Sequence, residues 1–494
     1  MSSHILSLNL LLPVLGILMI CTIPRNHSLI IRRIALIATG LQAWIAVQLL
    51  LNFDYRLEAL QMVEHVRWID ALNIDFFLAI DGLNLVFIIL SAIIFFTGAI
   101  ITEHSISRPT GFFSLYLLTD FAIMGLVSGL DMLLILCFTG IAIFAFFLLL
   151  AIWTETTEDI AAGQFALTGI FSFMVILAAA LLLHYDSALK SFVLPELIHG
   201  AHLTLSQRTI LLILTFCGLA PFIPVFPFHF HLRPALRNVP VSLKMVLTCI
   251  FAQIGIYYLL RFGQVIFPGT QATLVPLLAA LGTLNIVYGA IQVTQGDDLD
   301  AWTVPSTLIF SGLALLGIAA AVDLSVQSGF PQALGLTGAL FNVFNHGVLL
   351  ALFLVICYLQ NKPSDAGSDR HLPLLFVGVP VFAASFLPGL APFISLIMIL
   401  IPAFQSPVIR IFAWIALPGL MVYVASTLNL FRKIHQTRYS QSSATNPIPI
   451  RITLFILIPL LLLLVAFGIF PDWFSRWITH SIQQFASLFI TVTP

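Results

Sequence analysis

Long apolar runs separated by short polar segments make up most of this chain. A helix needs about 20 mostly apolar residues to cross the hydrocarbon core of a bilayer. Fourteen runs approach or exceed this length, and each is predicted to be one membrane span. The runs are residues 5–22, 34–52, 82–101, 111–129, 131–153, 164–184, 209–228, 240–260, 272–294, 303–323, 333–359, 372–404, 407–430 and 450–470. The pattern predicts an all-α polytopic membrane protein whose first run is a retained span, since it has no positive leader or cleavage site.

Proline interrupts two of these runs. The interrupting residues are Pro221, Pro224 and Pro227 in the seventh run, and Pro388 and Pro392 in the twelfth. A proline inside a helix removes a backbone donor and clashes with the preceding turn. In lipid, broken backbone is tolerated only where protein or a water-filled cavity satisfies it. Paired breaks in the two halves of a chain are typical of transporters with inverted repeats. We expect both breaks to be non-helical and to face the protein interior.

The segments outside the runs complete a four-part organisation. Residues 53–80 mix aromatic and acidic residues in short alternation, which favours a small hairpin. The tail from Asp472 is short for a span and predicts an amphipathic helix on the membrane surface. Linkers 361–371 and 434–448 are polar and are expected to be mobile. The predicted parts are three spans with the hairpin (1–110), a first repeat of spans four to eight (111–262), a second, inverted repeat (263–432), and a last span with the tail (433–494).

Composition agrees with a membrane protein and excludes several chemistries. Only 8% of the 494 residues are charged and 60% are hydrophobic, whereas a soluble domain is about 25% charged. The net charge of −1 gives no indication of a nucleic-acid partner. The five cysteines are isolated, with no spacing for zinc, an iron–sulfur cluster or a disulfide framework. No glycine-rich phosphate loop is present. We therefore expect no cofactor or metal in this chain, and no catalytic site of its own.

Lysine and arginine in the loops predict the orientation. Twelve follow odd-numbered spans and seven, including Arg261, follow even-numbered spans or lie in the tail. Because positive residues stay on the inner side of a membrane, this bias places both termini on the outer side.

Several short sequence strings, taken in their order along the chain, resemble those of a known family. The resemblance covers almost the whole chain. The strings are Ala79-Ile80-Asp81-Gly82-Leu83, Asp131-Met132-Leu133-Leu134, Pro224-Val225-Phe226-Pro227-Phe228-His229, Tyr258-Leu259-Leu260-Arg261-Phe262, Val287-Tyr288-Gly289-Ala290-Ile291-Gln292, Asn345-His346-Gly347 and Leu387-Pro388-Gly389. Together they resemble the antiporter-like membrane subunits of complex I, of the type of chain M of NADH–quinone oxidoreductase, which is mitochondrial subunit four. The resemblance implies a proton-translocating complex in a bacterial inner membrane, with other membrane subunits as partners and the redox cofactors elsewhere.

The sequence departs from this family at the residues of its central proton path. That path uses a glutamate in span five, lysines in spans seven and eight, and a charged residue in span twelve. The matching positions here are Gly140, Phe222, Gln253 and, approximately, Leu396. A proton path needs titratable groups or ordered water across the low-dielectric centre. This chain resembles the scaffold of the family without its usual charged groups.

Five titratable residues remain as candidates for a proton path. Asp120 lies near the middle of span four and is either a structural carboxyl or a proton carrier. Lys244 lies about one turn into span eight, where it either reaches the surface or pairs with a buried carboxylate such as Asp120. His346, in the middle of span eleven, is either a core histidine or part of a hydrated path. His229 and His231 follow the first break and are candidates for a cavity mouth. Asp81 and Asp131 stand before spans and are expected to cap helix N-termini.

Three functions fit these observations. The resemblance favours a membrane subunit of an NADH–quinone oxidoreductase-like complex, taking part in proton translocation or in its membrane scaffold. The second is a subunit of a multi-subunit cation/proton antiporter, which shares the fold. The third is a degenerate membrane anchor for a soluble partner, as in inorganic-carbon uptake.

Overall fold

A computed structural model gives the fold. It describes residues 4–57, 59–102, 106–154, 160–186, 191–200, 203–236, 239–296, 299–325, 329–361, 374–439 and 453–490. The helices of the first half are α1 (Ile5–Thr22), α2 (Ser28–Asn52), α3 (Gly82–Ile101), α4 (Pro109–Ser128), α5 (Met132–Trp153), α6 (Ile160–Asp186), α7 (Leu194–Gly200), α8 (Leu205–Leu219), α9 (Leu232–Ala235), α10 (Val241–Met245) and α11 (Ala252–Ile266). Those of the second half are α12 (Gln271–Val293), α13 (Leu299–Val322), α14 (Gly329–Asn361), α15 (Leu374–Ala384), α16 (Ala391–Gln405), α17 (Arg410–Tyr439), α19 (Ile458–Ile469) and α20 (Pro471–Ile490).

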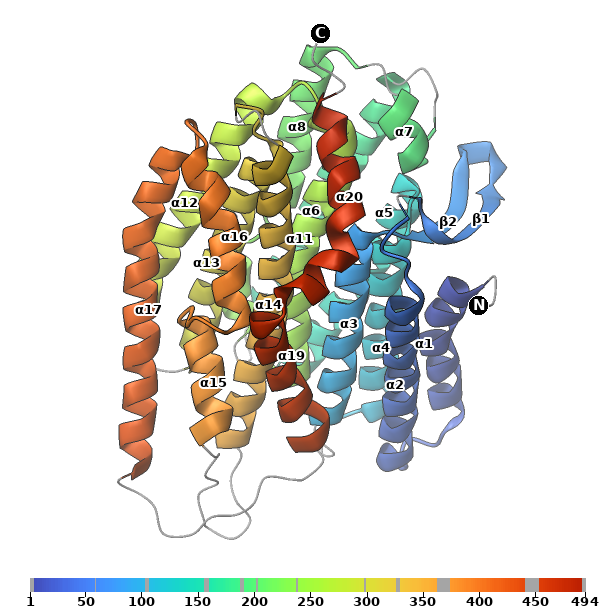
Figure 1. The fold of residues 1–494 in the computed structure, drawn as a ribbon. Helices are drawn as coiled ribbons and strands as arrows, with labels where there is room; N and C mark the ends of the chain where they lie inside the picture. Colours follow the sequence, from blue (N-terminus) through green and yellow to red (C-terminus); the bar gives the residue numbers. More distant parts are fainter. Residues whose placement is uncertain are drawn as a thin grey trace.

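These helices form one bundle of roughly parallel elements (Figure 1). Eleven of the described helical segments are long and apolar enough to cross a membrane. They match eleven of the fourteen predicted spans, and the other three correspond to the shorter helices α8, α15 with α16, and α19. Two of the long segments, in α13 and α14, have their most apolar stretch completely buried inside the protein. The prediction of an all-α polytopic membrane protein is confirmed, whereas the four-part division and the inverted relation of the repeats stay predictions.

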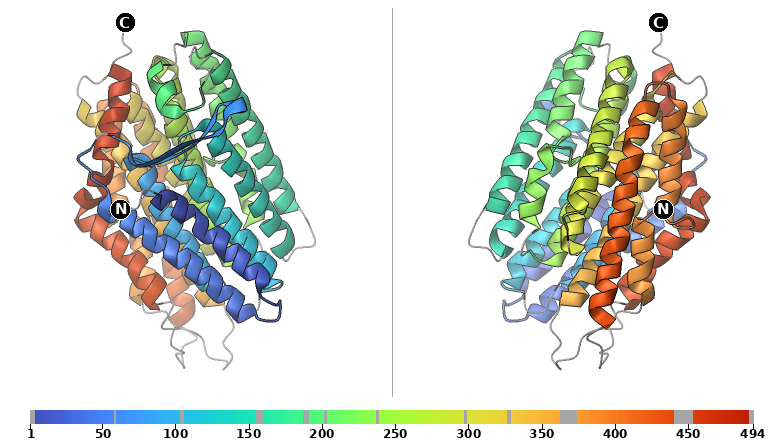
Figure 2. Two further views of the ribbon diagram at one scale, coloured as in Figure 1. Left: turned by 90° about the vertical axis from the view of Figure 1, so that its right-hand side faces the viewer. Right: turned by 90° about the vertical axis from the view of Figure 1, so that its left-hand side faces the viewer.

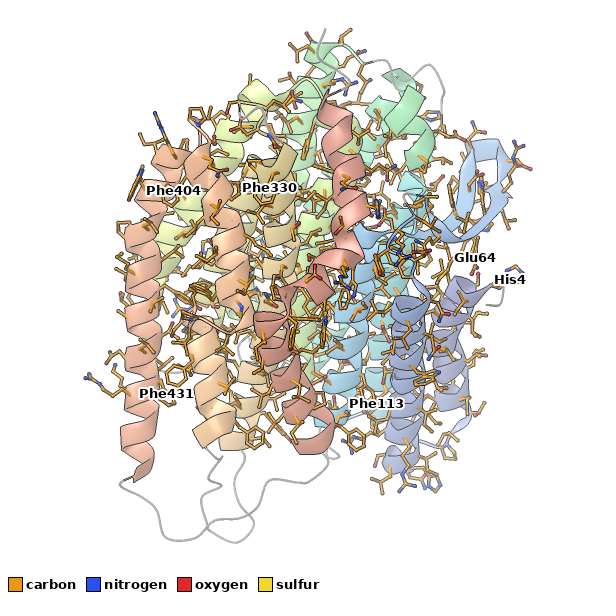
Figure 3. The ribbon with its side chains drawn as sticks, in the orientation of Figure 1. His4, Glu64, Phe113, Phe330, Phe404 and Phe431 are labelled. Atoms are coloured by element: carbon orange, nitrogen blue, oxygen red, sulfur yellow. The ribbon has the colours of Figure 1, made fainter. Side chains whose placement is uncertain are left out.

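The predicted hairpin is confirmed as two antiparallel strands, β1 (Gln61–Ile69) and β2 (Ile74–Ile80). A 3₁₀ turn at Asp70–Leu72 and the left-handed residue Asn73 connect them. The hairpin projects from the same flank of the bundle as α1 and α2 (Figure 2). Glu64 of β1 joins the two parts, because its carboxylate accepts from the backbone N–H of Leu6 at 2.7 Å and from Ser7 (Figure 3). A carboxylate is favourable there, where the free N–H groups of a helix N-terminus lie.

Both predicted breaks are present, but they differ in exposure. The chain leaves α8 at Leu219 and resumes helical structure only at a 3₁₀ turn, Phe228–His231. Residues 221–225 of this first break are buried, as expected, but Pro227 at its end is exposed, so our expectation was wrong for that position. The second break, residues 385–390, separates α15 from α16, and Pro392 lies in the first turn of α16 rather than in the break. Residues 387–389 are exposed on the surface of this chain, so our expectation that the second break faces the interior was wrong for these residues.

The C-terminal helix lies against the bundle, which corrects our expectation of a helix on the membrane surface. α19 and α20 meet at an angle of 78°. α20 runs along α3 and α14 (Figure 1) and buries Phe474, Ile478, Ile482 and Phe485 against them. Its amphipathic pattern was predicted correctly, but the surface that receives its apolar face belongs to the same chain. Most of the two polar linkers, at 362–373 and 440–452, falls outside the described residues.

Candidate functional site

The first break is stabilised by a side chain from another helix. Asn285 of α12 is fully buried, and its Nδ2 donates to the carbonyl oxygen of Pro224 at 2.9 Å. Its Oδ1 accepts from the backbone N–H of Phe226 at 2.8 Å. One carboxamide thus satisfies two backbone groups inside the break, as non-helical backbone at membrane depth requires. We did not single out Asn285 from the sequence, although a lone asparagine in an apolar span is a signal for such a role.

The break also depends on a close approach of α11. A Cβ atom at Gly255 would lie 2.5 Å from the backbone of Phe222 and of Ile223. Only a glycine can occupy this position without moving the break. One turn earlier the same span contains a π-helical segment, Val246–Phe251, an irregularity that is frequent at functional sites.

A line of neutral polar side chains passes from this region into the second half of the chain. We call Gln253, His346, Ser306 and Tyr423 the central polar chain; they come from α11, α14, α13 and α17. Gln253 Nε2 donates to His346 Nδ1 at 2.9 Å. Ser306 Oγ lies 3.5 Å from His346 Nε2 and 3.4 Å from the hydroxyl oxygen of Tyr423, at the long limit of hydrogen bonding. All four side chains are buried.

The contacts of His346 define its neutral form. Because Nδ1 accepts from Gln253, the ring proton is on Nε2, which faces Ser306. Phe310 stacks on the imidazole ring with centroids 4.4 Å apart. Gln253, which we matched in the sequence to a lysine of the resembling family, is thus the group that holds His346.

The other positions that depart from the family pattern are apolar in this structure. Phe222, in the first break, lies with its ring centroid 6.4 Å from that of Phe251. Gly140 of α5 faces the ring of Phe173, and Leu396 of α16 packs at the edge of the core. These three positions supply no titratable group, whereas His346 is an ionisable side chain that the structure brings into a polar network.

The remaining sequence candidates are placed apart from this chain. Asp120 is fully buried in α4 and its hydrogen-bond partner is Gln42 of α2. Lys244 is half-buried in α10. Among the described residues no ion pair joins Asp120 to Lys244, so a direct pair with Asp120, one of the two alternatives for Lys244, is not formed.

His229 and His231 follow the first break, as their sequence position implied. The His229 ring lies 5.3 Å from that of Tyr288, and His231 Nδ1 lies 3.3 Å from the carbonyl oxygen of Phe228. Both side chains are buried.

A buried ion pair was missed by the sequence analysis. Arg261, which we counted among the loop cations, lies in α11 with 3% of its side chain exposed and donates to both carboxylate oxygens of Asp81, at 2.6 and 3.0 Å. Its Nε donates to Tyr257 at 3.2 Å. Burial by itself raises the pKa of the Asp81 carboxyl, but the charge and hydrogen bonds of Arg261 outweigh it, so that pKa is lowered.

The expected capping roles are confirmed. Asp81 accepts from the backbone N–H of Asn84 at the start of α3, and Asp131 accepts from those of Leu133 and Leu134 at the start of α5. Asp81 thus joins the N-terminus of α3 to α11.

The bundle, its two interrupted spans and the central polar chain define a polytopic membrane protein with an antiporter-like fold. Residues 129–421, more than half of the chain, match the family described as NADH:quinone oxidoreductase/Mrp antiporter, transmembrane. The chain belongs to this family.

Individual relatives agree with this assignment. The chain is 28% identical to NAD(P)H-quinone oxidoreductase chain 4 1 of Synechococcus elongatus, over 87% of this chain and 81% of that one. Its fold matches a chain of respiratory complex I from Thermus thermophilus with a TM-score of 0.82 at 21% identity, covering 98% and 99% of the two chains. A chain of the Mrp complex of a Dietzia species matches with a TM-score of 0.77 at 16% identity, covering 99% of this chain and 55% of that one.

Proposed function

We propose that this protein is an antiporter-like membrane subunit of a proton-translocating complex of the NADH–quinone oxidoreductase type, and that His346 is the group through which it exchanges protons. The observation that carries the proposal is the central polar chain, which joins α11 to α13, α14 and α17 through His346. The similarity to quinone oxidoreductase chains supports the type of complex.

Imidazole suits this role because each ring nitrogen can accept and release a proton. A proton enters at Nδ1 when the Gln253 amide moves aside, and the Nε2 proton leaves toward Ser306. Histidine changes charge near neutral pH more readily than any other side chain, and an ionisable group inside a membrane bundle is a functional candidate by default. Asp120, Lys244, His229 and His231 stay candidates for steps outside the central polar chain.

Replacing His346 by phenylalanine is expected to reduce proton translocation by the reconstituted complex while electron transfer continues. Phenylalanine keeps the ring that stacks on Phe310 but removes both nitrogens. The measurement is the number of protons moved per electron pair in proteoliposomes. Tyr185→Phe, at an exposed position of α6, serves as the control and should leave this ratio unchanged. A wild-type ratio in the His346→Phe complex would show that His346 carries no protons.

The partners distinguish the proposal from its two alternatives. Purified in mild detergent, the chain is expected to bring with it other membrane subunits together with flavin and iron–sulfur subunits. Recovery with antiporter subunits alone would favour a cation/proton antiporter, as the fold match to an Mrp chain allows. Recovery with one soluble zinc-type protein would favour a membrane anchor.

We also propose a bacterial inner membrane as the location, with both termini on the outer side. The bias of loop cations supports this orientation. A cysteine at position 4, in a chain whose five cysteines are replaced, is expected to react with a membrane-impermeant thiol reagent added to intact cells. Protection from the reagent until the membrane is opened would reverse the orientation.

A further inference from the structure

A second buried polar site lies among the N-terminal helices, outside the central polar chain. Asp120 of α4 and Gln42 of α2 are both fully buried. Helices α1, α2 and α4 pack against one another on one flank of the bundle (Figure 1). None of these three helices contributes a residue to the central polar chain.

The nearby polar groups are engaged elsewhere. Tyr116, the titratable neighbour on α4, donates to the carbonyl oxygen of Phe95, and Thr39 and Thr119 bond to carbonyl groups of their own helices. This leaves the Gln42 carboxamide as the hydrogen-bond partner of Asp120 in the part of the chain that the structure describes.

No cation faces the Asp120 carboxyl from the helices packed around it. Within their described residues, α1, α3 and α5 contain no Lys, Arg, Asp or Glu at all. The cations of α2 are Arg32 and Arg33, and Arg33 is nine residues, about 14 Å along the axis, from Gln42. The acidic residue of β2 is Asp75, whose carboxylate contacts His65 at 2.6 Å. An ionised Asp120 would therefore be a buried charge without a counter-ion, which is strongly unfavourable.

The two orientations of the Gln42 amide match two protonation states of Asp120. With Nε2 toward the carboxylate, the amide donates to its two oxygens at 2.5 and 2.9 Å, as an ionised Asp120 requires. With the amide turned by 180°, its Oε1 takes the same place and accepts a hydrogen bond from a protonated carboxyl. In that orientation Nε2 donates to the carbonyl oxygen of Asn9 on α1, at 3.4 Å. Rotation of one amide thus satisfies either form.

We propose that Asp120 is a reversible proton-binding site, in which the protonated carboxyl donates to Gln42 Oε1 and the ionised carboxylate accepts from Gln42 Nε2. The ligand is a proton, and the amide of Gln42 turns when it binds or leaves. The inference is independent of the proposed role of His346, since the two sites share no residue.

Infrared difference spectroscopy of the purified complex tests this site directly. A protonated, buried carboxyl has a carbonyl band that is distinct from that of a carboxylate and shifts in heavy water. We expect such a band at neutral pH, its loss in Asp120→Asn, and its gradual replacement by a carboxylate band as the pH is raised. In Gln42→Leu the band should move to higher frequency, because the carboxyl loses its hydrogen-bond acceptor.

Two further variants control the assignment. Asp323 is also buried, but it accepts hydrogen bonds from Ser325 and Ser406, and Asp323→Asn should leave the band unchanged. Asp120→Glu should shift the band, and this variant assigns the band to Asp120 if the complex with Asp120→Asn does not assemble. The proposal is overturned if no band depends on Asp120, if its band does not respond to pH, or if Gln42→Leu leaves its frequency unchanged.

Discussion

Replacing Arg261 by methionine is expected to destabilise this protein by about 3–5 kcal/mol, the usual effect of removing one partner of a buried ion pair. The substitution leaves the Asp81 carboxylate largely buried, with 13% of its side chain exposed, and without its cation. It also releases the contact by which α11 holds the N-terminus of α3. The measurement is the thermal unfolding of the purified complex, together with the amount of the chain in membranes.

A double variant separates the charge from the packing. Asp81→Asn combined with Arg261→Met leaves no buried charge, and asparagine still caps α3, so most of the lost stability should return. Arg476→Met is the matched control. Arg476 forms an ion pair with Asp472 at 2.5 Å, but both side chains are more than half exposed, and such a pair contributes about 0–1 kcal/mol to stability. Equal losses in Arg261→Met and Arg476→Met would contradict our account of the buried pair.

The Asp81–Arg261 pair also has a defined pH dependence. The folded-state pKa of Asp81 lies below its ordinary value of 3.8. Its contribution to stability is therefore complete above that value, and it is lost as the pH falls through the lowered pKa.

Replacing Phe474 by alanine is expected to cost about 3–5 kcal/mol, as for other large aromatic residues in a packed interior. The ring of Phe474 is fully buried and lies 4.5 Å from that of Phe341 and 5.5 Å from that of Phe344, both on α14. Its loss should release α20 from the bundle. Increased protease cleavage within residues 471–490, and a lower unfolding temperature of the complex, are the expected results.

The neighbouring Trp473 supplies the control for this experiment. Its side chain is 52% exposed, and Trp473→Ala should change the stability by no more than about 0.5 kcal/mol. Deleting residues 472–494 should have a larger effect than Phe474→Ala, with loss of assembly. Normal assembly of the shortened chain would refute the structural role of α20.

The sequence by itself determined the elements of this protein. Apolar length identified the spans, because lipid forces each span to satisfy its own backbone hydrogen bonds. Proline located both breaks, because it disrupts a helix at its own position. The caps formed by Asp81 and Asp131 depended only on the residues that follow them. These features are decided within a few neighbouring positions, and the structure confirmed them.

The tertiary structure decided what each polar side chain contacts. Gln253 and His346 are 93 residues apart, and Arg261 and Asp81 are 180 residues apart, so no local pattern could pair them. The exposure of residues 387–389 and the docking of α20 likewise depend on which helices pack beside them. In a bundle of apolar helices many packings bury similar surface, and a few buried polar contacts select among them. The order of runs along the chain predicted the spans, whereas the partners of Asp120, His346 and Arg261 follow only from how the helices pack.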